Sequence, residues 1–287
     1  MTAVTARTRR LVIFAMCAVF VAAAPIAYAQ RIWVGGGRFG GFNRMPPKWA
    51  SESDFDGSFI YCRGFYTSRY REQGGQGWST DYPGADNNFS VRLAELTTVR
   101  VKLDEQRQPN HVVVALTDPL LFRCPILFME DVGTIELSEA EVQNLRDFFL
   151  KGGFLWVDDF WGSFAWDNWS LQIGRVLAPG EYPTFDIPRD HPIMHTLYDV
   201  EEVPQVCSIQ FWNPRYPHET SERGPDSAQV HFRGIQDSHG RLMVLMSHNT
   251  DIAYTWEREG ENQQYFDLFS PRGYAVGVNV LLYALTH

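Results

Sequence analysis

Short apolar runs alternate along the chain with segments whose apolar residues recur at helical spacing. Residues 111–116 form a β-branched run of the kind that is buried on both faces of a parallel sheet. Residues 126–129 and 154–157 are shorter apolar runs and predict two more buried strands. Residues 228–235 and 241–246 predict a strand pair, because the segment between them, Asp-Ser-His-Gly, is a plausible hairpin turn.

The helical pattern is clearest after residue 138. Ser138 and Glu141 form a capping box, and apolar residues then recur at helical spacing until Gly152, which predicts a helix over 139–151. The last segment predicts a second helix, too short to span a membrane, that packs on the sheet. Its apolar face carries Tyr274, Val278, Leu281 and Leu285.

Residues 160–169 are rich in aromatic side chains and predict a loop that enters a short helix ending near Val176. The order of strand, helix, strand and helix is typical of an α/β protein with an open, largely parallel sheet and helices on both faces. The pattern contains no internal repeat.

The first residues have the order of an export signal. Three arginines precede an apolar run over 11–24, and Ala27-Tyr28-Ala29 supplies a small-x-small cleavage site. We therefore expect a signal peptide over 1–29, a flexible Gly- and Pro-rich lead-in over 30–50, and one α/β domain over 51–287. An uncleaved membrane anchor is the alternative, and a loose twin-arginine pattern leaves the export route open.

Charge and cysteine content narrow the classes of partner. Cleavage after residue 29 would remove three of the 25 basic residues and none of the 34 acidic ones, so the formal charge would move from −9 to −12. Such a chain repels phosphate backbones and anionic lipid, so we expect no nucleic-acid partner and no peripheral membrane docking. After signal cleavage we also expect no stable membrane span, because the last apolar segment is too short. Cys62, Cys124 and Cys207 would remain, enough for one disulfide at most, and their pairing stays open.

Polar residues follow three of the predicted strands, where ligands bind in open α/β sheets. Asp118 or one of the paired aspartates could equally cap a turn or helix. The strand-end candidates are Asp118, then Asp158 and Asp159 as possible catalytic carboxylates, then His248, Asn249 and Asp251.

The segment 81–92 is the most compact polar string. If Asn87 or Asn88 caps a helix beginning at Phe89, Arg92 lies one turn inside it, near the positive end of the helix dipole. A loop at that point could hold an anion, together with Asp81 and Asp86. The simpler interpretation is a capped helix after a Pro-Gly turn.

Other site chemistries have weaker support. No G-x-S-x-G or G-x-C-x-G sequence occurs, so the nucleophile turn of many hydrolases is absent from the chain. The four carboxylate and imidazole groups of Asp158, Asp159, His248 and Asp251 could bind a divalent cation, but we expect neither a metal nor a cofactor. Trp161 and its aromatic neighbours could stack on a sugar or peptide, although such clusters are more often core.

Four motifs resemble a bacterial family catalogued as domain of unknown function 4159, from about residue 58 to 287. They are DYPGADNNF at 81–89, GGFLWVDDF at 152–160, HPI at 191–193 and GRLMVLMSHN at 240–249. That family looks related to class I glutamine amidotransferases and ThuA-like proteins. The resemblance implies a flavodoxin-like three-layer α/β sandwich whose strand after Gly152-Gly153 would end at the nucleophile.

The chain departs from that pattern where the chemistry would sit. An amidotransferase carries cysteine at this strand end, and this chain carries Asp158-Asp159. We therefore expect a periplasmic or secreted, non-catalytic ligand-binding or scaffold domain. Its partner would be a small molecule, a glycan or an envelope protein. The alternative is a periplasmic hydrolase in which Asp158 or Asp159 acts as general base, with a glycan held by the tryptophan-rich loop.

Overall fold

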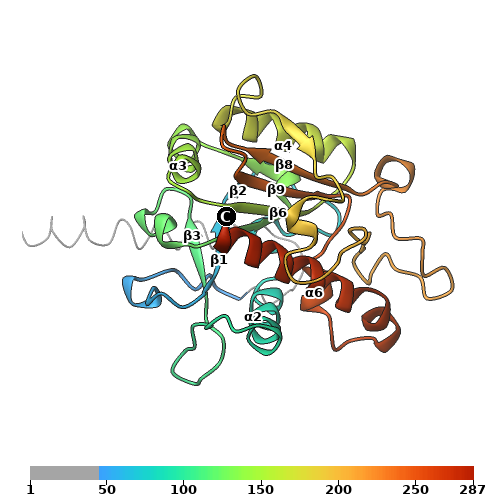
Figure 1. The fold of residues 1–287 in the computed structure, drawn as a ribbon. Coiled ribbons are helices and arrows are strands. Elements are labelled where there is room, and N and C mark those ends of the chain that lie inside the picture. The colour runs from blue at the N-terminus through green and yellow to red at the C-terminus, as the bar shows by residue number, and fades with distance from the viewer. Residues whose placement is uncertain (1–44) are drawn as a thin grey trace, which may run out of the picture. The chain divides into compact units, whose positions relative to one another are not determined.

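A computed structural model describes residues 45–287. A seven-stranded mixed sheet forms its centre, in the order β3-β1-β4-β6-β9-β8-β7 (Figure 1). The first five strands in this order are parallel to one another. β8 is antiparallel to both of its neighbours, β9 and β7. The strands are β1 (Tyr61–Phe65), β3 (His111–Ala115), β4 (Leu127–Glu130), β6 (Leu155–Phe160), β7 (Thr184–Asp186), β8 (His231–Gln236) and β9 (Leu242–His248).

Five helices accompany the sheet. In Figure 1, α3 and α4 lie on one side of it, and α2 and α6 lie on the other. Two short strands, β2 (Thr67–Ser68) and β5 (Ile135–Glu136), pair separately. The helices are α2 (Gly84–Leu96), α3 (Glu139–Leu150), α4 (Gly162–Val176), α5 (Tyr254–Glu257) and α6 (Gln263–Thr286).

Successive strand residues point to opposite faces, so each buried strand contributes to two apolar cores. Tyr61 and Trp156 join one core, which α2, α5 and α6 cover. Cys62 and Leu155 join the other, which α3 and α4 cover. This explains why the central strands read as continuous apolar runs rather than as alternating ones.

The predicted central elements are confirmed. The 139–151 helix is α3, with a capping box in which Ser138 Oγ accepts from the Glu141 N–H and Glu141 accepts from the Ser138 N–H. The predicted hairpin is the antiparallel pair β8 and β9. Gly240 closes its turn with a φ of 84°, a conformation that favours glycine. The predicted C-terminal helix is α6.

Two predicted boundaries were wrong. The expected aromatic loop at 160–169 is mostly helix, because α4 already begins at Gly162. The helix expected from Phe89 begins five residues earlier, at Gly84, since Pro83 supplies the N-terminal boundary instead of an asparagine. Asn87 and Asn88 therefore lie inside α2 and do not cap it.

The expected signal peptide over 1–29 lies outside the described residues, as does the lead-in up to residue 44. The end of that lead-in adds to the sheet edge, where the Ala50 N–H donates to Val113 and the Val113 N–H donates to Lys48. Within residues 45–287, no helix has both the length and the apolar character needed to cross a membrane.

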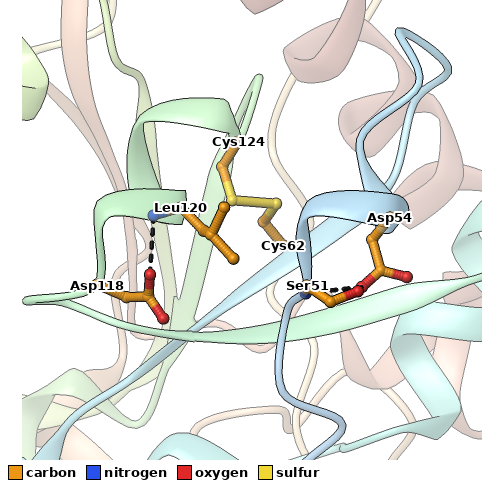
Figure 2. Close-up of a disulfide and its surroundings, with 6 residues drawn as sticks. All are labelled: Ser51, Asp54, Cys62, Asp118, Leu120 and Cys124. Atoms are coloured by element: carbon orange, nitrogen blue, oxygen red, sulfur yellow. Dashed lines mark hydrogen bonds between the residues drawn. A yellow bond between two sulfur atoms is a disulfide. The ribbon is translucent and has the colours of Figure 1, made fainter.

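One disulfide joins Cys62 on β1 to Cys124, which follows the short 3-10 helix at Pro119–Arg123 (Figure 2). Their Cα atoms lie 5.9 Å apart, and 62 positions of sequence separate them. Cys207 is buried with a free thiol. Of the possible pairings, the structure therefore forms the one between β1 and the segment that connects β3 to β4.

Candidate functional site

A polar hollow lies beyond the carboxyl ends of the parallel strands. Its cavity volume is about 40 Å³. Seven carboxyl groups line it, against two guanidinium groups. The carboxyl groups belong to Glu72, Asp81, Asp131, Asp159, Glu222, Asp251 and Glu257, and the guanidinium groups to Arg223 and Arg258; Trp161 and Tyr254 also contribute to the wall.

Three of these acids come from neighbouring strands. Asp131 follows β4, Asp159 lies near the end of β6, and Asp251 follows β9, and these strands are adjacent in the sheet. Because parallel strands end at the same edge, the order of the strands places the three carboxyl groups around one hollow.

The backbone is strained at several of these positions. Asp81, Asp131 and Asp159 line the hollow, and all three have positive φ values, between 52° and 58°. Each such conformation costs a non-glycine residue about 1 kcal/mol or more, and strain of this kind clusters at functional sites. At Asp159 it accompanies a register shift between β6 and β9. The bulge turns the Asp159 side chain toward the hollow, where Oδ1 accepts a hydrogen bond of 2.8 Å from the Trp161 indole.

Asp158 and Asp159 do not share the hollow. Neighbouring strand residues face opposite ways, so Asp158 lies under α5, where Oδ2 accepts a 2.9 Å hydrogen bond from the Ala253 N–H. Its Oδ1 is buried and has no hydrogen-bond partner. Burial raises the pKa of Asp158 well above its usual range, and the neighbouring Glu130 adds to the rise. Of the paired aspartates, Asp159 is therefore the one that lines the hollow.

The carboxyl groups of the hollow hold protons more tightly than exposed ones. Burial raises the pKa of Glu72 to about 7, of Glu222 to about 8 and of Asp159 to about 6. Burial also raises the pKa values of Asp131 and Asp251 well above their usual range, and the charge of Asp159 adds to both. The two arginines of the hollow do not neutralise its seven carboxyl groups, so the hollow lacks positive charge.

The two arginines are already paired with wall residues. Arg223 lies 3.5 Å from Glu72 and 3.4 Å from Glu222, and its guanidinium group lies over the Phe211 ring. Arg258 lies 2.6 Å from Glu257 and 2.6 Å from Glu261. The other four carboxyl groups of the hollow, those of Asp81, Asp131, Asp159 and Asp251, form no ion pair with either arginine.

A buried cluster of charged side chains lies next to the hollow. Arg63 on β1 pairs with Asp86 at the start of α2 and, at 2.6 Å, with Glu130 at the end of β4. The same guanidinium group donates to the Thr80 carbonyl oxygen at 2.9 Å, next to Asp81. Arg63 therefore fixes the backbone that carries Asp81. Asp86 belongs to this cluster and does not line the hollow.

The other candidates on α2 have structural partners outside the hollow. Asn87 bonds to His111, at 2.9 Å, and Asn88 donates to the Trp256 carbonyl oxygen at 2.8 Å. Arg92 pairs with Glu95 and with Glu259. Because α2 begins earlier than expected, Arg92 lies in its third turn, away from the positive end of the dipole. Arg92 is therefore not placed at the helix start, where the anion site was expected.

Asp118, His248 and Asn249 also lie elsewhere. Asp118 caps the 3-10 helix beside the disulfide, where it accepts from the Leu120 N–H at 2.8 Å (Figure 2). Its strand, β3, is at the sheet edge, and two strands separate it from β6. His248 bonds to the Gly162 carbonyl oxygen, and burial lowers its pKa to about 4. Asn249 accepts from the Gly162 N–H, so both hold the start of α4.

The aromatic residues after β6 are mainly core. Phe160 and Trp169 are fully buried, whereas Trp161 reaches the wall of the hollow. Phe164 is 69% exposed and contacts Tyr70 on the outer surface. They do not form one platform on which a sugar could stack.

Several residues in and next to the hollow were not expected from the sequence. Glu130 and Asp131 follow a predicted strand, as Asp158 and Asp159 do, so the strand-end rule could have found them. Glu72 and Glu222 lie in irregular segments and have no local signal. Among the described residues, no three His, Cys, Asp or Glu side chains are arranged to hold a metal ion.

Residues 67–285 match the family model described as Domain of unknown function (DUF4159). This match covers more than half of the chain and includes all the carboxyl groups that line the hollow. A search of curated proteins finds no match.

Proposed function

The chain belongs to the DUF4159 family, and on that premise we propose that it binds a small cationic ligand in the acidic hollow and catalyses no reaction there. One observation carries this proposal. Asp81 is only 7% exposed, it lines the hollow, and its Oδ2 atom receives no hydrogen bond from any donor. A buried carboxylate oxygen without a donor costs free energy that a cationic ligand would recover.

The surroundings of Asp81 select for positive charge. Glu257, Glu130 and Asp159 all raise its pKa, beyond the larger effect of burial, and Arg63 offsets only part of this. An anionic ligand would meet seven carboxyl groups in the same space. A cation would replace the missing counter-charge without having to break the existing ion pairs of Arg223 and Arg258.

The proposed fold relationship is to class I glutamine amidotransferases and ThuA-like proteins, with a flavodoxin-like three-layer arrangement. The seven-stranded, mostly parallel sheet with helices on both faces supports it. In such a fold the strand end occupied by Asp159 would carry the nucleophilic cysteine. A carboxylate at that position is the reason to propose binding without amidotransferase chemistry.

The proposed location is the periplasm or the extracellular space. The order of basic, apolar and small residues over 1–29 supports it, and the disulfide between Cys62 and Cys124 fits an oxidising compartment. A cationic small molecule, or a basic group on a glycan or envelope protein, would then be the partner.

The test is isothermal titration of the purified chain with a panel of charged probes. Putrescine, agmatine and Ca²⁺ represent cations, and citrate represents anions of similar size. We expect at least one cation to bind and citrate not to bind. Asp81→Asn should weaken cation binding, whereas Glu105→Gln, which removes one exposed negative charge outside the hollow, should not. Binding of citrate in preference to all cations would refute the proposal.

A hydrolase is the second candidate, and the conformation of Asp159 favours it. This half-buried carboxylate has a φ of 52° just before α4 and a pKa raised to about 6 by burial, so it could serve as a general base near neutral pH. Screening with chromogenic glycoside and ester substrates tests this function. Turnover that Asp159→Asn abolishes and Asp158→Asn preserves would support it over simple binding.

A further inference from the structure

We propose that the carboxyl pair of Asp81 and Glu257 receives the nitrogen of an organic cation, an ammonium or guanidinium group. This inference rests on the proposed function and assigns the ligand class and its point of contact. It concerns one side of the hollow, where two acids from distant parts of the sequence meet.

The packing of α2 against α5 brings the two acids together. Asp81 stands three residues before α2, and Glu257 is the last residue of α5. The Phe89 and Trp256 rings, one from each helix, lie 4.4 Å apart between their centroids. The Asn88 side chain donates to the Trp256 carbonyl oxygen at 2.8 Å. The relative position of the pair is therefore fixed by the core and not by the ligand.

Gly84 makes room for Glu257. A Cβ atom at this first position of α2 would lie 2.8 Å from Cγ of Glu257, too close for the side chain to keep its place. Glycine is otherwise unfavourable in a helix by about 1 kcal/mol relative to alanine. Because Gly84 has no side chain, the side chain of Glu257 can keep its place in the hollow, which Asp81 also lines.

Both acids line the hollow, and one oxygen of each, Oδ2 of Asp81 and Oε2 of Glu257, is buried without a hydrogen bond. The charge of Glu257 raises the pKa of Asp81, so a positive charge placed between the two acids would favour their ionisation. Arg258 lies beside Glu257 but also serves Glu261, and Arg63 is held by Asp86 and Glu130. Neither guanidinium group forms an ion pair with Asp81, and Arg63 offsets only part of the rise in its pKa.

The shape of the pair favours nitrogen donors. An ammonium or guanidinium group has several N–H bonds that can point to separate carboxylate oxygens. The nearby Trp161 and Tyr254 rings line the same hollow and suit the weakly hydrated face of an organic cation. A divalent metal ion would instead need several oxygens around one point. No such group of three acidic or imidazole side chains exists in residues 45–287.

Binding of a cation should favour ionisation of Asp81 and Glu257 and so release protons, and affinity should therefore rise with pH. Burial raises the pKa of Asp81 and of Glu257, and the acids that face them, Glu130, Asp159 and Glu261, oppose their ionisation further. Arg258 and Arg63 act in the opposite direction. The cation replaces the proton as the counter-charge of the pair.

The experiment titrates putrescine and agmatine into the purified chain at pH 7 in two buffers of different ionisation enthalpy. The difference in observed heat gives the number of protons released. We expect net proton release. Asp81→Asn, Glu257→Gln and Gly84→Ala should each weaken binding about tenfold or more, the value of one charge-assisted hydrogen bond. Glu222→Gln, across the hollow beside Arg223, should weaken it less, and Glu105→Gln should leave it unchanged.

The outcomes separate this inference from the proposed function. If Ca²⁺ binds and neither amine does, the hollow still takes cations but the carboxyl pair is not an amine site. If the amines bind without proton release, or if Glu222→Gln weakens binding more than Asp81→Asn does, the contact point is wrong. If no cation binds, both proposals fail. Melting curves of each variant show whether it is folded, and Gly84→Ala tests the pair with both carboxyl groups retained.

Discussion

Nη1 of Arg63 lies 2.6 Å from Oε2 of Glu130, and both side chains are buried. Arg63 also pairs with Asp86, so one positive charge is shared by two acids in the interior. Burial raises the pKa of Glu130, and Arg63 opposes that rise. A cluster of this kind is costly to break, because each remaining charge would stay desolvated.

We therefore expect Arg63→Met to lower the free energy of unfolding by about 3 to 5 kcal/mol, the usual cost of removing one partner from a buried ion pair. Urea denaturation followed by circular dichroism measures it. The triple change Arg63→Met, Asp86→Asn and Glu130→Gln should recover part of the loss, since no unpaired charge remains. A single-variant cost below about 1 kcal/mol would mean that water reaches the cluster.

Glycines of α6 explain how closely this helix approaches its neighbours. A Cβ atom at Gly277 would lie 2.4 Å from the Trp256 ring and 2.7 Å from the Phe89 ring. Gly277→Ala should thus destabilise the protein by about 1 to 3 kcal/mol through overpacking, although alanine is the better helix former.

Gly174 in α4 is the matched control for this substitution. The nearest atom to a Cβ there is Cγ of Pro179, at 3.5 Å, which is ordinary contact. Gly174→Ala should therefore stabilise the protein by about 0.5 to 1 kcal/mol. Thermal melts of the two variants should shift in opposite directions. A stabilising Gly277→Ala would contradict the close packing of α6 on Trp256.

The sequence predicted the strands and helices well where periodicity was strong. The β-branched run at β3 and the capping box of α3 are local signals, and both elements formed as expected. The order of the strands is not local. The sequence placed Asp118 with Asp159 because both follow strands, but β1 and β4 lie between β3 and β6. Only the long-range pairing of strands decides which strand ends meet.

Burial of charge was equally hard to predict. Arg63 interrupts an apolar segment and gives no sign that Asp86 and Glu130 will surround it. The conformation of Asp159 depends on a register shift against β9, which no periodicity encodes. Asp159 and Asp251 were found because they follow predicted strands, whereas Glu257 enters the hollow only through the packing of α5 on α2.

The disulfide between Cys62 and Cys124 should contribute about 4 kcal/mol, the loop-closure value for 62 positions of separation. Cys62→Ala with Cys124→Ala, or reduction of the native chain, should lower the denaturation midpoint accordingly. Cys207→Ala is the control, because this buried thiol has no partner and its loss removes only a small apolar group. Equal losses from both changes would show that packing, not the cross-link, accounts for the effect.

The acidic hollow makes the stability of the protein depend on pH. Burial raises the pKa of Asp159, Glu72 and Glu222 to about 6, 7 and 8 in the folded chain, above the values near 4 of an unfolded one. Between about pH 4 and pH 8 the folded state therefore binds more protons than the unfolded state. Stability is then fully present at the acidic end of this window and is lost as the pH rises.

Asp159→Asn isolates one contribution to this slope. The amide keeps an oxygen for the Trp161 indole but removes a charge that burial and the neighbouring Glu257 oppose. We expect the variant to be about 1 kcal/mol more stable than the native chain at pH 8, a value discounted for the partial exposure of Asp159, and nearly equal to it at pH 4. Urea titrations at the two pH values measure this difference. A native chain more stable at pH 8 than at pH 5, or a variant with the native slope, would mean that these carboxyl groups are well solvated. Saturating putrescine should reduce the slope of the native chain, because a bound cation replaces the protons that the hollow loses.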